Sequence, residues 1–303
     1  MNQKMPDYHE PVMAMQCIEG LAIEEGGIYV DATFGGGGHS ALILQQKGVK
    51  KLFGIDQDDD AIQNKINDDR LVMIHHNFKY MKQFLKYHKA IPVDGILADL
   101  GISSYQINEG TKGFSYRFDE RLDMRMDQHA ELDAVGILNT YSVEDLTNIF
   151  KLYGELNNAW HLANDIVSYR KRKSIEKVSD LLEAIKNHTP KTGDYAFLSK
   201  VFQAIRIEVN QEMQVLEKFL EQCNVVLKPK GRLVIMTYHS LEDRIVKNYL
   251  AHGNFNGEPV KDAFGNLIRP FKPINNKVIV PDVEEINRNK RARSAKLRIA
   301  EKI

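Results

Sequence analysis

The segment from Ile28 to His39 constrains the fold of this chain more than any other. Its first residues, Ile28 to Val30, are apolar and favour a strand. Gly35 to Gly38 follow, and glycine can adopt backbone angles closed to other residues and lets a ligand come close. Ser40 to Gln46 then predicts a helix whose N-terminal N–H groups face that ligand. The pattern therefore indicates a strand, a ligand-binding glycine loop and a helix.

An acidic residue at a set distance from the glycines indicates what the loop binds. Lys51 to Ile55 predicts a second strand that ends in Asp56, 21 residues after Gly35. In nucleoside-binding α/β folds, an acid about 20 residues past the glycine turn binds the ribose hydroxyls. We therefore expect Asp56 to bind a ribose.

Two classes of nucleoside-containing ligand compete for this loop. The dinucleotide pattern G-x-G-x-x-G would need a glycine where Ser40 stands, counting from Gly35. The chain instead has Asp31 followed by Gly35 and Gly37, which resembles the first motif of S-adenosylmethionine methyltransferases. That ligand has no pyrophosphate, so a phosphate-binding helix start is not required. The segment favours a methyltransferase, with nicotinamide or flavin binding as the alternative.

The strand pattern continues as far as residue 100. Leu71 to His75 and Val93 to Leu100 predict a third and a fourth strand. Nearly continuous apolar strands that alternate with helices indicate a parallel sheet covered on both faces, an α/β fold. Ligands of such sheets bind beyond the carboxyl ends of the strands. The residues that fall at those ends are Asp31, Asp56, Phe78 and Asp99.

The strand pattern then stops for about a hundred residues. Signals from Leu132 to Val209 are helical, and the sheet pattern resumes with a helix over Glu212 to Leu227. Lys277 to Val280 and Lys296 to Ala300 predict two closing strands. We therefore predict a sheet domain made of residues 1–105 and 210–303, interrupted by a helical domain of residues 106–209.

Composition limits the partners of this chain. Its 41 Lys and Arg balance its 41 Asp and Glu, so binding to nucleic acid must use local patches. The basic runs at 170–173 and 288–298 could supply phosphate contacts, although a charge run is usually a solvated face. No apolar run approaches the roughly 20 residues of a membrane span, and no signal peptide is evident. Two cysteines suit a reducing compartment, so we expect a cytoplasmic protein with no membrane partner.

Eight blocks in order resemble the bacterial small-subunit ribosomal RNA cytosine-N4 methyltransferases, the MraW or RsmH family. They cover nearly the whole chain, and their order makes chance matches an inadequate explanation. The blocks are His9–Val12, Asp31–Ser40, Asp99–Ser104, Gly113–Tyr116, Leu122–Asp127, Phe202–Ile207, Tyr238–Arg244 and Arg291–Ser294.

The resemblance implies a class I S-adenosylmethionine methyltransferase sheet with an inserted all-helical domain for substrate recognition. It also implies methylation of N4 of one cytosine in the decoding centre of 16S ribosomal RNA, within the small subunit, and no action on DNA. The family's cofactor contacts fall on Gly37, Gly38, His39, Asp56, Phe78, Asp99 and Gln106. His39 and Gln106 enter only through the resemblance.

Two residues are candidates for catalysis. Cytosine N4 is a poor nucleophile, and an acceptor hydrogen-bonded to its amino group would help it to lose a proton. Asp99 lies where such an acceptor is needed, although its role could instead be limited to binding the cofactor. His239 follows a fifth strand, predicted over Arg232 to Tyr238, and faces the same edge, although it could be structural. Methyl transfer needs no metal, so none is expected.

Other functions stay open at this point. The same fold serves DNA and protein methyltransferases, and an RNA-binding ribosome assembly factor could keep the pocket without catalysing a reaction.

Overall fold

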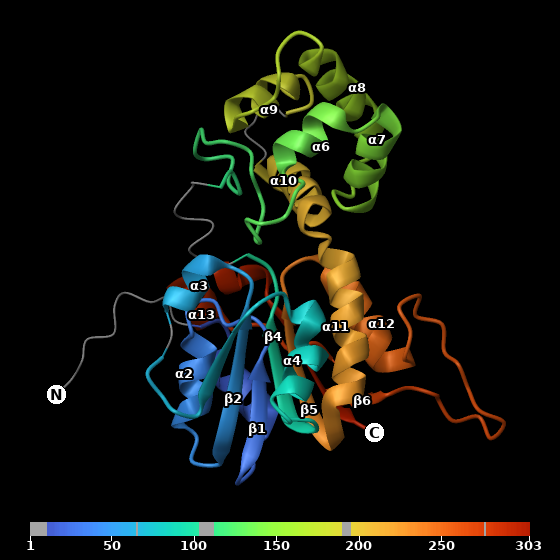
Figure 1. Cartoon of the computed structure of the whole chain (residues 1–303). Coiled ribbons are helices and arrows are strands. Elements are labelled where there is room, and N and C mark those ends of the chain that lie inside the picture. Colours follow the sequence, from blue (N-terminus) through green and yellow to red (C-terminus); the bar gives the residue numbers. More distant parts are fainter. Residues whose placement is uncertain (1–10, 65, 103–111, 190–194, 276) are drawn as a thin grey trace. The chain divides into compact units, whose positions relative to one another are not determined.

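A computed structural model describes residues 11–64, 66–102, 112–189, 195–275 and 277–303 (Figure 1). The chain divides into two compact units. The sheet unit comprises Met1–Gly101 and Met213–Ile303, and the helical unit comprises Ile102–Glu212. The limits predicted from the sequence were 105/106 and 209/210.

Seven strands form the sheet, in the order β3-β2-β1-β4-β5-β7-β6. Strands β1 to β5 pair in parallel, and β7 runs antiparallel between β5 and β6. This arrangement confirms the predicted class I methyltransferase sheet. The strands are β1 (Gly27–Asp31), β2 (Val49–Asp56), β3 (Leu71–His75), β4 (Val93–Asp99), β5 (Leu227–Thr237), β6 (Phe271–Pro273) and β7 (Lys296–Lys302).

One closing strand was predicted wrongly. The sequence indicated a strand over Lys277 to Val280, but Ile279 forms only an isolated bridge with Leu297. The strand that pairs with β7 is β6, which is three residues long and ends in a proline. A strand of three residues is too short to show a periodic pattern in the sequence. The apolar residues around Ile279, in contrast, show the pattern of a strand although they do not form one.

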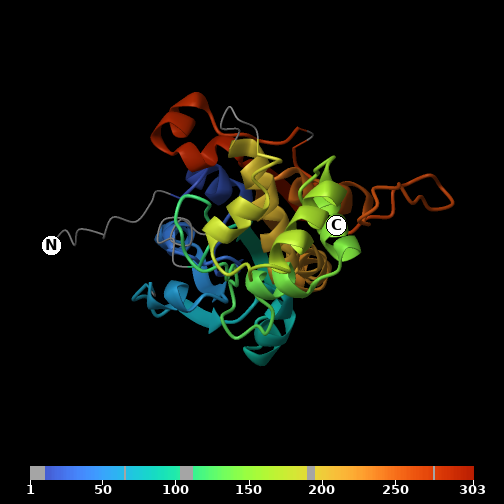
Figure 2. The same cartoon turned by 90° about the horizontal axis from the view of Figure 1, so that it is seen from above.

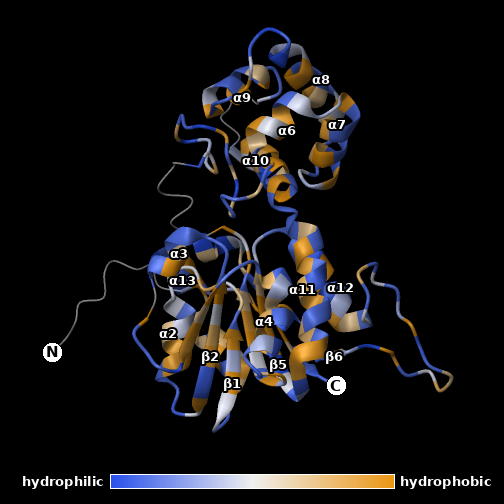
Figure 3. Cartoon of the chain, viewed as in Figure 1, coloured by the Kyte–Doolittle hydropathy of each residue, from blue (hydrophilic) through white to orange (hydrophobic). Residues whose placement is uncertain are grey.

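Helices cover both faces of the sheet. The helices and 3₁₀ turns of this unit are α1 (Ala14–Leu21), α2 (Gly38–Gln45), α3 (Asp59–Gln63), η1 (Phe78–Tyr80), α4 (Met81–Tyr87), α11 (Glu212–Val226), α12 (Ser240–His252), α13 (Val283–Arg288) and η2 (Lys290–Ser294). Figure 3 shows apolar residues concentrated in the strands. No helix in the described ranges is long and apolar enough to cross a lipid bilayer.

Successive strand residues serve two different cores because side chains alternate across a strand. On β5, Leu233 and Ile235 join the core that Phe219 of α11 completes. Between them, Val234 packs into the other core, together with Ile43 of α2. A sheet buried on both faces needs the continuous apolar strands that the sequence shows.

The first and last thirds of the sequence meet on one face of the sheet unit. Figure 2 shows α1 beside the C-terminal helix α13. The backbone N–H of Met13 donates a hydrogen bond to Oε1 of Glu285, and both residues are buried. This carboxylate satisfies a backbone donor at the start of α1 that the helix itself leaves without a partner.

The helical unit has a core of its own. Its described helices are α6 (Ala134–Thr140), α7 (Val143–Leu152), α8 (Ala159–Arg170), α9 (Val178–Ala184) and α10 (Tyr195–Asn210). Four of its helices each contribute a fully buried side chain to this core: Leu138, Phe150, Leu162 and Ile205. A capping box of Ser142 and Asp145 starts α7. A separate core gives this unit the means to hold its shape independently of the sheet.

An ion pair ties α12 to the neighbouring β7. Asp243 accepts hydrogen bonds from Nε and one terminal nitrogen of Arg298, at 2.7 and 3.1 Å, and lies 3.4 Å from Nζ of Lys296. Burial raises the pKa of Asp243, but these two cations outweigh it and leave that pKa below its ordinary value. The ionised form of Asp243 is therefore more stable in the folded protein than in the unfolded chain.

Replacing Asp243 with asparagine should lower the free energy of unfolding at pH 7 by about 1.5–3 kcal/mol. The lowered pKa means that the stabilisation is present above the unfolded value of about 3.9 and is lost as pH falls through the folded one. Urea unfolding at pH 7 and pH 3 measures this, and the difference between the two proteins should be smaller at pH 3. The control is Asp69→Asn, an exposed residue whose replacement should change stability by less than about 0.5 kcal/mol. A difference that is equal at both pH values would contradict the assignment.

Candidate active site

Asp31 fixes the glycine loop to the helix that follows it. The residue ends β1 and is 1% exposed. Its Oδ2 accepts a hydrogen bond from the Ser40 hydroxyl at 2.6 Å, and its Oδ1 accepts one from the backbone N–H of Thr33 at 3.2 Å. Burial raises its pKa, and His39 and these hydrogen bonds oppose that effect. Both oxygens of Asp31 serve the loop, so its role here is to shape the site.

Asp56 holds the loop from the neighbouring strand. Its Oδ2 accepts a hydrogen bond from the backbone N–H of Gly35 at 2.7 Å, and its Oδ1 accepts one from Asp58 at 3.0 Å. Burial raises the pKa of Asp56 to about 6, although the two hydrogen bonds lower it. The side chain is partly exposed, and a carboxylate can accept more than two hydrogen bonds. Asp56 can therefore bind a hydroxyl pair while it keeps the loop in place.

Gly37 is required by the backbone and by its neighbours. Its φ is +76°, a left-handed conformation, and it is the N-cap of α2. A Cβ atom here would lie 2.9 Å from the ring of Phe34, which is buried under the loop. Next to it, a Cβ on Gly38 would lie 3.3 Å from Pro11. The two glycines thus allow the loop to lie close over apolar side chains.

Asp99 ends β4 and is hydrogen-bonded to residues that follow the two neighbouring strands, β1 and β5. Its backbone N–H donates to Oγ1 of Thr33 at 2.7 Å, and its Oδ1 accepts a hydrogen bond from the hydroxyl of Tyr238 at the same distance. Burial raises the pKa of Asp99 to about 6, while His39 and the Tyr238 hydroxyl lower it. The side chain is 25% exposed. At neutral pH, Asp99 is therefore an ionised acceptor, although its buried surroundings disfavour the charge.

His39 lies beside this carboxylate on the first turn of α2. Its Nε2 is 3.0 Å from the carbonyl oxygen of Val12, and its Nδ1 is 3.9 Å from Oδ2 of Asp99. A carbonyl only accepts, so Nε2 carries a proton, and in neutral His39 the Nδ1 is an acceptor. The contact between Nδ1 and Oδ2 of Asp99 is then attractive when a proton is bound to either of these two atoms. His39, one of the two residues that only the resemblance suggested, is thus adjacent to Asp99.

Phe78 follows β3 and is partly buried. Its ring meets that of Phe219 edge-on, with centroids 5.0 Å apart. Part of the Phe78 ring therefore packs against α11, and a ligand could contact the part that is exposed.

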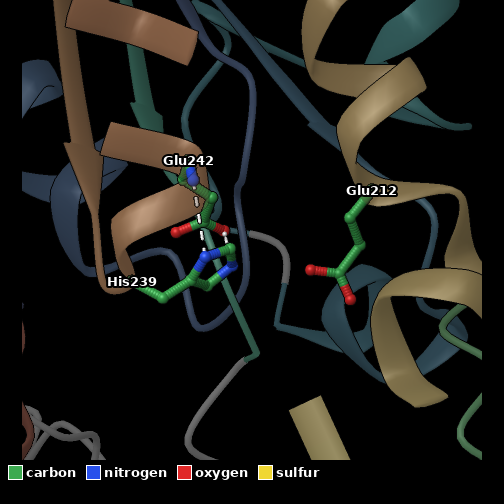
Figure 4. Close-up of side chains that lie close together, drawn as sticks. All are labelled: Glu212, His239 and Glu242. Carbon is green, nitrogen blue, oxygen red and sulfur yellow. Dashed lines mark hydrogen bonds and ion pairs between the residues drawn. The ribbon is translucent and has the colours of Figure 1, made fainter. Parts of the chain in front are cut away.

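His239 is turned toward its own helix. It is the N-cap of α12, its Nδ1 is 3.4 Å from the backbone nitrogen of Glu242, and its Nε2 is 3.1 Å from Oε1 of the same residue (Figure 4). The Nε2 contact is not aligned as a hydrogen bond. The described residues show no hydrogen bond between His239 and Asp99. This placement favours helix capping, which was the structural alternative for His239.

Two predicted features cannot be placed with the site. Gln106 lies outside the described residues. The basic run at 170–173 is largely occupied within the helical unit: Arg170 donates to the carbonyl of Leu138, and Lys173 pairs with Asp180 at 2.6 Å. The run therefore offers fewer free cations than its sequence suggests.

The second basic run is less occupied. Arg298 is paired with Asp243, but no ion pair involves Lys290, Arg291 or Arg293 in the ranges that the structure describes. Burial lowers the pKa of the half-buried Arg291, which lies near enough to Tyr238 to sense its hydroxyl, and Arg293 is exposed. These three residues remain candidates for phosphate contacts.

The helical unit contains a small cavity of about 140 Å³. Its lining includes Tyr141, whose hydroxyl donates to Glu208 at 3.0 Å, and the exposed Asp145. None of its residues is among the cofactor candidates, so the cavity does not bear on their assignment.

Sequence reasoning missed two residues of the site. Thr33 links the loop to Asp99, and Tyr238 holds the Asp99 side chain. Tyr238 does appear in one of the resembling blocks, but nothing there indicated a contact with a residue 139 positions away. Both hydrogen bonds join residues that are far apart in the sequence, and they form because of the order of the strands in the sheet.

Comparison with known proteins identifies the family. The profile of the MraW methylase family matches residues 7–303. A protein from Flavobacterium johnsoniae is 51% identical over 298 residues, 98% of each chain, and one from Parabacteroides distasonis is 51% identical over 305 residues, 100% of each chain. A third, from Bacteroides thetaiotaomicron, is 52% identical over 296 residues, 97% of each chain, and all three are named ribosomal RNA small subunit methyltransferase H. With its sheet topology and the loop that Asp31 and Asp56 shape, the chain thus belongs to the MraW methylase family and is an S-adenosylmethionine-dependent methyltransferase.

Proposed function

We propose that this protein methylates N4 of a cytosine in the decoding centre of 16S ribosomal RNA. The observation that carries the proposal is the identity of about half the residues, over the whole length, with relatives named for the small-subunit RNA. The geometry supports it because two ionisable aspartates, Asp56 and Asp99, end strands on either side of β1 and its glycine loop. The protein would act in the cytoplasm, where small subunits are assembled.

The charges at this edge of the sheet suit the cofactor. Asp31, Asp56 and Asp99 are close enough for Asp31 to raise the pKa of both other acids. Among the described residues, His39 makes the largest contribution that lowers the pKa of Asp99. Such an acidic edge favours a nucleoside that carries positive charge. S-adenosylmethionine carries a sulfonium and an amino group, so the residues fit it.

Each candidate would hold a different part of the cofactor. Asp56 would accept hydrogen bonds from the ribose hydroxyls, while Gly37 and Gly38 let the backbone approach. His39 and Asp99 would bind polar groups nearby, and the exposed part of Phe78 would contact the adenine. Gln106 is proposed only from the family pattern.

The chemistry requires alignment and a proton acceptor. When bound, the cofactor supplies an activated methyl group on sulfur, and the enzyme must hold the acceptor nitrogen in line with it. Asp99 would accept a hydrogen bond from the cytosine amino group and then its proton. His239 is kept as a second candidate, but its contacts with Glu242 argue for a capping role.

The helical unit would recognise the RNA. Its separate core supports a distinct function. Within the sheet unit, Lys290, Arg291 and Arg293 would contact phosphates.

Digesting 16S RNA from cells with and without this protein, and weighing the fragments, tests the function. The expected result is a fragment of the decoding centre that is one methyl group lighter in its absence. Labelled methyl that enters DNA or protein instead would assign the chain to those substrates. RNA binding without methyl transfer would make it an assembly factor.

Replacing Asp56 with alanine should weaken S-adenosylmethionine binding by about 1.5–3 kcal/mol, roughly 10- to 100-fold, because the ribose loses a charged acceptor. Asp56→Asn separates the charge from the shape, since it keeps an acceptor for the Gly35 N–H. Titration calorimetry measures both variants. The control is Asp59→Ala, which removes an exposed acid three residues later that contacts His75. Unchanged affinity in a folded Asp56→Ala protein would remove Asp56 from the site.

Reversing Arg291 and Arg293 to glutamate should weaken RNA binding and flatten its salt dependence. For every phosphate that the variant no longer neutralises, the slope of log K against log salt should fall by roughly 0.7–0.9. Fluorescence anisotropy over a salt series measures this. The control is Lys82→Glu with Lys86→Glu on α4, which makes the same change of charge on another exposed surface. An Arg291/Arg293 variant with the wild-type slope would make this run a solvated surface.

A further inference from the structure

The position of Tyr238 is set by Gly101 as well as by Asp99. Tyr238 directly follows β5, and its hydroxyl donates to Oδ1 of Asp99 at 2.7 Å. Gly101 has a φ of +98°, and a Cβ atom there would lie 3.3 Å from Cδ2 of the Tyr238 ring. The ring is therefore held against the backbone that leaves β4, with its hydroxyl directed at the carboxylate.

The two oxygens of Asp99 have different surroundings. Oδ1 is occupied by the Tyr238 hydroxyl. For Oδ2, the described part of the chain offers only His39 Nδ1, at 3.9 Å, which is too long for a hydrogen bond. With a quarter of the side chain exposed, Oδ2 is the oxygen that can accept a hydrogen bond from a ligand.

We propose that Tyr238 is a positioning residue for methyl transfer, whose hydroxyl holds Oδ1 of Asp99 so that Oδ2 accepts the proton of the cytosine amino group. This inference rests on the proposed function and deepens it. Asp99 would touch the substrate, whereas Tyr238 would act only through Asp99.

The proton transfer balances as follows. A bond forms between N4 and the methyl carbon, the carbon–sulfur bond breaks, and its electron pair goes to sulfur. N4 then carries one proton more than the product keeps, and Oδ2 takes that proton. Asp99 must therefore be ionised before the reaction, and any change that raises its pKa reduces the active fraction at low pH.

The groups that face Asp99 come from five segments besides its own strand. Asp31 on β1 and Glu242 on α12 raise the pKa of Asp99, while His39 on α2 and the Tyr238 hydroxyl after β5 lower it. The buried thiol of Cys17 on α1 is also close enough to sense the Asp99 charge, and Arg291 senses the Tyr238 oxygen. Because the hydroxyl stabilises the ionised form, its loss must raise the pKa of Asp99.

The test compares the wild-type protein with Tyr238→Phe, which removes only the hydroxyl. Carbon-13 NMR of labelled aspartate, assigned with Asp99→Asn, gives the pKa of Asp99 in the cofactor-free protein. That pKa should rise by about 1 unit. In the pH profile of kcat/KM, the acid limb should move upward by the same amount, and activity above pH 8 should fall less than activity at pH 6. His39→Gln, a second variant in the same surroundings, should also raise the pKa.

Tyr249→Phe is the matched control, because Tyr249 is a buried tyrosine of α12 whose ring stacks on that of Phe255. It should leave the Asp99 titration and the acid limb unchanged. An unchanged pKa of Asp99 in Tyr238→Phe would overturn the proposal, and so would a raised pKa without movement of the acid limb. The NMR titration needs no substrate. A protein that methylates no ribosomal RNA would therefore refute the proposed function while the coupling of Tyr238 to Asp99 was still measured.

Discussion

The hydrogen bonds between strand-end carboxylates and the glycine loop are the interaction on which the site depends. Asp31 and Asp56 accept from the backbone of residues 33 and 35, and the Asp99 N–H donates to the Thr33 hydroxyl. A loop rich in glycine loses much conformational freedom when it is ordered. Three neighbouring strands fix it here, because a parallel sheet brings their carboxyl ends to one edge. The same carboxylates are costly to bury, which raises the pKa of Asp56 and Asp99 to about 6 and leaves them ready to accept hydrogen bonds.

The part of the fold that follows local patterns was predictable. Strands β1 to β4 are apolar, alternate with helices and end in polar residues, so their parallel pairing could be expected before any coordinates were known. The C-terminal edge was not predictable in the same way. β6 is a three-residue strand that forms by pairing with β7, and no pattern within Phe271–Pro273 predicts this pairing. The apolar residues around Ile279 had the stronger local signal, and they make only a bridge.

For the candidate site, the sequence located the acids better than their partners. Asp56 and Asp99 could be chosen because each ends a predicted strand. The Tyr238 contact could not, since it joins β4 to β5 across the whole helical insertion. His239 attracted attention as a titratable residue near the same edge, but a histidine before a helix is also a capping group, and Glu242 supplies its contacts. The run at 170–173 likewise looked free because sequence does not show that Asp180 pairs with Lys173.

The point of insertion connects these observations. β4 and β5 pair in parallel although a unit with its own core separates them in sequence. The sheet tolerates the insertion because the chain leaves after β4 and returns through α11, which supplies the crossover that any parallel pair requires. Asp99 is the last residue of β4, and only Leu100 and Gly101 separate it from the helical unit. The acid proposed to accept the substrate's proton thus stands where the chain enters the unit proposed to bind that substrate. Tyr238 directly follows β5, the strand that pairs with β4, and its hydroxyl holds the Asp99 carboxylate, so residues at the ends of neighbouring strands fix this acid within the sheet unit.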